Sequence, residues 1–161
     1  MATWQFDCVL IPRAGHPAAA RAAAHLLRDG SERLWNGHPV ATLMSELEVL
    51  GKPQPTWAPD TVMWGHEDST CLLLAASGDA TEELRLRIDM RHPDDALLRN
   101  VLRCCRTLDL LVVTHEGDVV EPRLEWLMRS AATSPAGRFV ADPEQFLAAL
   151  ASAPTEVDDN D

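Results

Sequence analysis

The sequence predicts an α+β domain in which a single, mostly antiparallel sheet carries helices packed on one face. Short strand-like runs follow one another across turns that contain glycine and acidic residues, as in antiparallel hairpins. Helical periodicity is confined to separate segments between these runs. The chain has 161 residues, the usual size of one domain. We therefore expect residues 1–151 to form a single α+β domain and residues 152–161 to form a disordered acidic C-terminal tail.

The N-terminal part is expected to contain a strand and a helix. Residues alternate between two faces over Trp4–Ile11, and Pro12 ends this run. An alanine-rich helix is predicted over Ala18–Arg28, because alanine has the highest helix propensity. Asp29 and Gly30 are expected to end that helix.

The next part is expected to form a helix, a loop and a hairpin. Pro39 suits the first turn of a helix, and apolar residues recur at helical spacing from there to Gly51. The three prolines within residues 52–60 predict a loop. Strands are expected over Thr61–Trp64 and Thr70–Ala76, joined by a polar turn.

The clearest strand pattern lies in Glu82–Met90. Apolar and charged residues alternate there, which is typical of an antiparallel strand with one face in water. A helix is expected to open at Pro93, with acidic residues in its first turn, and to continue to Leu108. A second hairpin is predicted over Leu110–Thr114 and Val119–Glu121.

Two helices are expected in the C-terminal part. The first covers Leu124–Ala132 and includes Trp126, which we expect in the core. The second is predicted to begin at Asp142, because a capping aspartate followed by Pro143 is typical of a helix start. The side of this helix that is expected to be buried consists of Phe146, Leu147 and Leu150.

The charge of the chain limits its partners. It has 25 acidic and 14 basic residues, a formal net charge of −11, which disfavours binding to nucleic acid or to an anionic membrane. No apolar run approaches the roughly 18 residues of a membrane helix, and the N-terminus lacks a signal-peptide pattern. The four cysteines lack metal-site spacing and suit a reducing compartment. These features predict a cytoplasmic protein.

Motifs for catalysis, metal binding and cofactor binding are absent from the sequence. There is no GxSxG, P-loop, GxGxxG or HExxH pattern. Cys104 is expected in the middle of a helix, where its thiolate is not stabilised, which disfavours a catalytic pair with His115. We therefore predict a non-enzymatic protein, with no catalytic residue, metal ligand or cofactor.

Polar residues gather in the two predicted hairpin turns, residues 65–68 and 115–118. Each turn contains a histidine followed by acidic residues. Tryptophans in irregular segments are common at binding surfaces, although they also close the edges of hydrophobic cores. The candidate partner-binding residues are Trp35, Trp64, His66, Glu67, Asp68, Glu116 and Asp118.

Five segments distributed over most of the chain carry a resemblance to a known group. They are Trp4–Asp7, Leu10–Arg13, Trp64–Asp68, Arg85–Arg91 and Phe139–Pro143. Together they resemble small, mostly uncharacterised proteobacterial proteins found near polymorphic or type VI secreted toxins. The resemblance implies an immunity protein that binds its cognate toxin, and it carries over no active residues.

Two hypotheses about function follow. The first is an immunity-type protein that neutralises a bacterial toxin, expected to be basic, through protein–protein binding. The alternative is a small enzyme or ligand-binding domain whose polar pocket uses His66, Glu67, Asp68, His115 and Glu116. A housekeeping subunit or a homo-oligomer is also compatible with the sequence.

Overall fold

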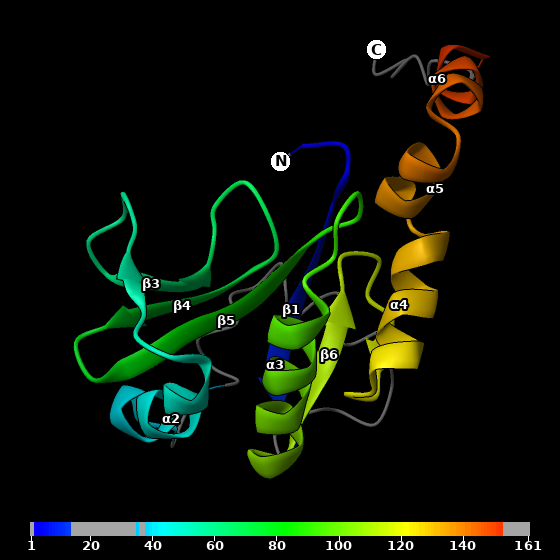
Figure 1. Ribbon diagram of the computed structural model, residues 1–161. Coiled ribbons are helices and arrows are strands. Elements are labelled where there is room, and N and C mark those ends of the chain that lie inside the picture. The colour runs from blue at the N-terminus through cyan, green and yellow to red at the C-terminus, as the bar shows by residue number, and fades with distance from the viewer. Residues whose placement is uncertain (1, 14–34, 36–37, 153–161) are drawn as a thin grey trace, which may run out of the picture.

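Seven strands form one antiparallel sheet in the computed structural model, which describes residues 2–13, 35 and 38–152 (Figure 1). The strands are β1 (Gln5–Pro12), β2 (Gln54–Pro55), β3 (Thr61–Gly65), β4 (Cys71–Ser77), β5 (Ala80–Asp89), β6 (Leu110–Thr114) and β7 (Val119–Val120). The helical elements are α2 (Val40–Leu47), the 3-10 turn η3 (Glu48–Leu50), α3 (Asp95–Thr107), α4 (Leu124–Thr133), α5 (Pro135–Ala141) and α6 (Pro143–Ser152). The predicted helix over Ala18–Arg28 and residues 153–161 of the predicted tail lie outside the described residues.

The strand order is β2-β3-β4-β5-β1-β6-β7, and all neighbouring strands are antiparallel. The prediction of an α+β fold with one antiparallel sheet is therefore confirmed. The first strand of the chain lies in the interior of the sheet, between β5 and β6. This position brings the N-terminus beside residues that come much later in the sequence.

One side of the sheet, here called the inner face, carries the core. The β1–β5 register places Phe6 opposite Ile88, Cys8 opposite Leu86, and Leu10 opposite Leu84. Helix α3 lies in front of this face, with α2 and α4 on either side (Figure 1). Its Leu98 and Val101 are fully buried, and Asp94 caps it by accepting a hydrogen bond from the Leu97 amide.

The opposite side, here called the outer face, changes character across the sheet. Ile11 on β1 and Val113 on β6 point to this face and are buried apolar residues. Towards β5 the same face carries charged residues. Asp7 lies opposite Arg87, and Arg85 precedes Arg87 by two residues on β5. The charged alternation predicted for β5 is therefore observed on the outer face.

Helix α6 departs from the prediction that its apolar side is buried. It has no buried residue, and Leu147 and Leu150 are 56% and 58% exposed. The reason is that α6 packs against α5, where Phe139 and Phe146 meet edge to face, and lies away from the sheet (Figure 1). The prediction that Trp126 belongs to the core is also wrong, since this residue is 50% exposed.

Two short elements were not expected from the sequence. Helix α5 begins where the Ser134 hydroxyl accepts a hydrogen bond from the Gly137 amide and Pro135 occupies the first turn. Strand β2 lies within the predicted loop of residues 52–60, and its two residues pair with β3 at the edge of the sheet. A proline is tolerated at an edge, where one side of the strand makes no ladder.

Candidate functional site

The two predicted polar turns lie at the same end of the sheet, here called the turn end. The β3–β4 turn and the β6–β7 turn both leave the sheet where β1 begins and β5 ends. The residue pairs that establish this are Gly65 with Cys71, Cys71 with Arg87, Arg87 with Asp7, and Cys8 with Thr114.

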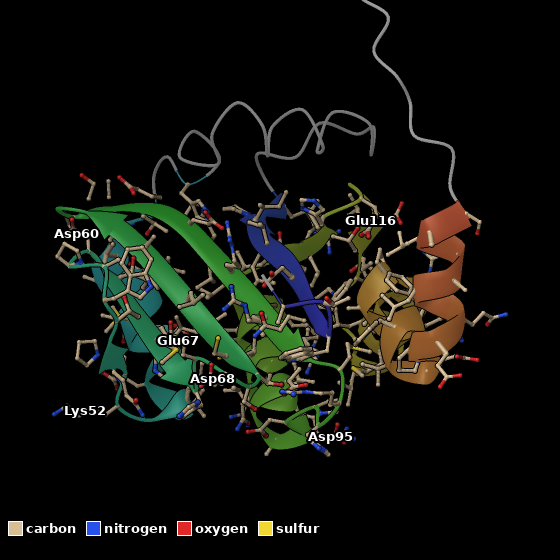
Figure 2. The ribbon with its side chains drawn as sticks, turned by 90° about the horizontal axis from the view of Figure 1, so that it is seen from above. Lys52, Asp60, Glu67, Asp68, Asp95 and Glu116 are labelled. Carbon is tan, nitrogen blue, oxygen red and sulfur yellow. The ribbon has the colours of Figure 1, made fainter. Side chains whose placement is uncertain are left out.

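The two turns are nevertheless well separated along that end. Four strand spacings lie between β3 and β6, which corresponds to roughly 19 Å at about 4.8 Å per strand. Figure 2 shows Glu67 and Asp68 together, with Glu116 on the far side of β1. This separation is too large for His66 and His115 to serve one small pocket. Within the described residues, no group of three or more histidine, cysteine or acidic side chains is placed to hold a metal ion.

The β3–β4 turn is held in one conformation by its backbone. Gly65 has a φ of +93°, and a Cβ at this position would overlap with the carbonyl oxygen of Thr70. The Ser69 amide donates to the His66 carbonyl at 3.0 Å, and the Asp68 amide donates to His66 Nδ1 at 3.3 Å. As a result, Glu67 and Asp68 are exposed on a defined turn.

The β6–β7 turn is organised by the buried Thr114. Its hydroxyl accepts a hydrogen bond from the Asp118 amide at 3.1 Å, and its carbonyl accepts one from the Gly117 amide at 2.9 Å. Gly117 has a φ of +87°, which favours glycine. The side chains of Glu116 and Asp118 are left exposed on this turn.

The two candidate tryptophans lie in the core instead of at a surface. Trp64 is on the inner face, is 2% exposed, and donates from Nε1 to the Gly51 carbonyl at 3.0 Å. Trp35 is also 2% exposed and meets His38 edge to face. Their predicted place on a partner-binding surface is therefore corrected, because both indoles are enclosed by other side chains.

A shallow cleft of about 410 Å³ opens beside the β3–β4 turn on the outer face. It contains two of the predicted residues, Glu67 and Asp68, together with residues that the sequence did not single out. The complete lining is Ala2, Trp4, Gln5, Glu67, Asp68, Arg87 and Arg91.

Each arginine of this cleft is paired with a carboxylate of the sheet. Arg91 donates two side-chain hydrogen bonds to Asp89, at 3.0 and 2.7 Å, and its guanidinium lies 4.2 Å from the centre of the Trp4 ring. These hydrogen bonds lower the pKa of Asp89. Arg87 Nε donates to Asp7 Oδ1 at 3.2 Å.

The Asp7–Arg87 pair is well shielded from water. The side chains of Asp7 and Arg87 are 7% and 20% exposed. Oδ2 of Asp7 is buried and has no hydrogen-bond partner among the described residues, and the same holds for Nε1 of Trp4. In the sequence, the only trace of this pair is a charged residue at an alternating position of each strand, Asp7 on β1 and Arg87 on β5.

The cysteines are not arranged as nucleophiles. All four are buried. Burial raises the pKa of Cys105 to about 12 and also raises the pKa of Cys8, Cys71 and Cys104. Cys104 donates from Sγ to the Glu46 carbonyl at 3.4 Å. These thiols therefore remain protonated near neutral pH and are poor nucleophiles.

No helix in the described ranges is long and apolar enough to cross a membrane. Comparisons with protein-family models, curated proteins and solved structures give no match, so the interpretation of this site rests on its own geometry and charge.

Proposed function

We propose that this chain is an immunity-type protein, which binds a basic cognate toxin through the turn end of its sheet and thereby blocks it. The observation that carries the proposal is the placement of two acidic turns at one end of the sheet, roughly 19 Å apart. A standard interface buries about 800 Å² on each partner. Such a patch is roughly 30 Å across, so one partner protein can cover both turns.

The charge of these turns suits a basic partner. Glu67, Asp68, Glu116 and Asp118 are exposed, and the ion pairs of the described residues include none of them. The chain as a whole carries a net charge of −11. Complementary charge accelerates association, and it does so most strongly at low ionic strength.

The rigidity of the turns supports binding as well. The backbone hydrogen bonds around Gly65 and Gly117 restrain the turns before any partner arrives. Binding through such preorganised segments loses less conformational entropy than binding through flexible ones. If the toxin is a nuclease, these carboxylates could occupy the positions of nucleic-acid phosphates.

The direct test uses the product of the gene adjacent to the one that encodes this chain. We expect the purified neighbour to bind this chain with an association rate that falls steeply between 50 and 500 mM salt, and to arrest growth only in cells that lack it. A neighbour that neither binds nor arrests growth would contradict the proposal.

The contribution of the turn end is tested with charge-neutral variants. We expect E67Q/D68N/E116Q/D118N to slow association about tenfold or more. The control D60N/D79N removes two exposed carboxylates from the opposite end of the sheet, where β3 begins and β4 meets β5, and should associate at the rate of the wild type. The quadruple variant removes four charges and the control removes two, so an equal effect per charge removed would show that only net charge matters.

A further inference from the structure

We propose that α6 is the contact surface of a weak symmetric dimer, in which its apolar side packs antiparallel against the same helix of a second copy of this chain. The inference does not depend on the proposed function, because it concerns another part of the molecule and another partner. Its basis is the apolar side of α6, here called the α6 stripe, which consists of Phe146, Leu147 and Leu150.

The residues of the α6 stripe lie together on one side of a helix that has no buried residue. At about 100° per residue, all three fall within roughly 100° of the helix circumference. Leu147 and Leu150 are 56% and 58% exposed, and Phe146 is half-buried against Phe139 of α5. Figure 1 shows α6 beyond α5, away from the sheet. A second apolar surface can therefore reach the stripe.

The other large apolar side chains that the described residues leave exposed are scattered. They are Val49 in η3, Trp57 in the β2–β3 loop and Trp126 in α4. Apolar residues that are exposed singly are normal on a protein surface, whereas neighbouring ones are typical of an interaction site. This difference distinguishes the α6 stripe from the rest of the described surface.

The charge of the chain favours this stripe as the place where two copies meet. Each copy has a net charge of −11, so contact through most of the surface would bring carboxylates together. Glu144, in the first turn, is the only charged residue of α6. Two copies can therefore pack their stripes without opposing carboxylates. A basic partner, by contrast, gains little electrostatic attraction at this stripe.

Among the described residues, the edges of the sheet are poor sites for self-association. The outermost strands, β2 and β7, are two residues long, and β2 ends in Pro55. Very short strands and proline at an edge oppose edge-to-edge pairing of sheets. This leaves the α6 stripe as the better candidate for a contact between copies.

A two-fold axis between Leu147 and Leu150 makes the contact self-complementary. In an antiparallel pair about this axis, Leu147 of each copy lies opposite Leu150 of the other, and Gln145 lies opposite Ser152. The alanines at 148, 149 and 151 are small enough for the two helices to approach closely. A parallel pair is disfavoured, because the four acidic residues of 153–161 would then follow α6 from the same end in both copies.

The size of the contact predicts a weak dimer. With ten residues, α6 is about 15 Å long, so two such helices cover less than the about 800 Å² per partner of a standard interface. We therefore expect monomers in dilute solution and dimers at high micromolar concentration.

The first test measures the average mass of the full chain by sedimentation equilibrium, from micromolar to millimolar concentration. We expect the mass to rise towards twice that of one chain and not beyond. Raising salt from 50 to 500 mM should tighten the dimer about threefold, because salt screens the repulsion between two acidic chains. Salt should weaken the proposed toxin complex, so the two associations are distinguishable. A monomer at every concentration, or a dimer that salt weakens, overturns the proposal.

Variants test the contribution of the stripe. Leu147→Gln/Leu150→Gln should weaken the dimer about tenfold or more, because two apolar contacts are lost from each copy. The control Val49→Gln/Trp126→Gln removes two apolar side chains of similar exposure, 47% and 50%, from other elements and should dimerise as the wild type does. Circular dichroism checks that both variants are folded. Normal dimerisation of the stripe variant, or equal loss in the control, overturns the proposal.

The orientation of the copies is tested with the stripe intact. A nitroxide is attached at Ser152→Cys, and this chain is mixed with isotope-labelled wild type for NMR. All four native cysteines are buried, so the introduced cysteine takes the label. In the antiparallel dimer, the amide of Gln145 should broaden most strongly within α6. Strongest broadening at Ser152, or outside α5 and α6, overturns the proposed pairing.

Discussion

The two faces of the β1–β5 strand pair have opposite characters. On the inner face, Leu10, Leu84 and Leu86 are at most 1% exposed and pack under the helices. On the outer face the same two strands carry Asp7 and Arg87, a shielded ion pair. Apolar burial is the main driving force of folding, whereas a buried ion pair is weak evidence for stability. The inner face is therefore expected to supply most of the stability, and a functional surface is expected on the outer face.

The largest effect on stability is expected from a substitution in the inner face. Leu86→Ala removes a fully buried side chain from the middle of the sheet, and we expect a loss of about 2–5 kcal/mol in the free energy of unfolding. Urea denaturation measures this loss. The matched control is Leu150→Ala in α6, which is 58% exposed and should change stability by about 0.5 kcal/mol or less. Similar losses in both variants would remove the distinction between core and surface leucines.

The next largest effect on stability is expected when the ion pair of the outer face is broken. Arg87→Met leaves Asp7 as a shielded carboxylate without its cation, and we expect a loss of about 2–4 kcal/mol. The double variant Asp7→Leu/Arg87→Met should recover most of this stability, because an apolar pair of similar size replaces both charges. A double variant as unstable as the single one would mean that the pair itself stabilises the fold.

A smaller effect concerns the dependence of stability on pH. The pKa of Asp89 is lowered, chiefly by its hydrogen bonds from Arg91, so the folded state binds a proton less readily than the unfolded chain does. This contribution to stability is present above the unfolded pKa of about 3.9 and is lost as pH falls through the lowered folded value. Thermal melts of the wild type and Asp89→Asn should therefore converge as pH falls from 5 to 2. Parallel curves would contradict the expectation.

The smallest effect on stability is expected at the turn end. E67Q/D68N should change the free energy of unfolding by about 0.5 kcal/mol or less, since both side chains are exposed and lack ion pairs in the described residues. The same two substitutions belong to the quadruple variant that is expected to slow association with the basic partner. A large loss of stability in chemical denaturation would place these carboxylates among the structural residues of the fold.

Part of the site was visible in the sequence. Glu67, Asp68, Glu116 and Asp118 were predicted to lie in hairpin turns, and the structure places all four on such turns, with their side chains exposed. Trp35 and Trp64 were misplaced because a tryptophan in or near an irregular segment has the same local pattern whether it anchors a partner or closes the core. Only the surrounding side chains distinguish these cases.

The cleft was not predictable from any one segment. Arg87 is 80 residues from Asp7 in the sequence, and they meet because β1 inserts between β5 and β6.

The exposure of α6 also depends on tertiary contacts and not on its own sequence pattern. Its apolar spacing is typical of a helix that packs on a sheet, but its contacts are with the short helix α5.

Amino-acid pattern alone determined the alternating strands, the Asp142 helix cap and the acidic hairpin turns, because each depends on the chemistry of a few adjacent residues. Tertiary structure alone decided that both turns share one end of the sheet, that two tryptophans are buried, and that arginines line a cleft beside Glu67 and Asp68. The physical reason is that strand order is selected by the free energy of the whole core. Residues of similar local character can therefore finish in very different surroundings.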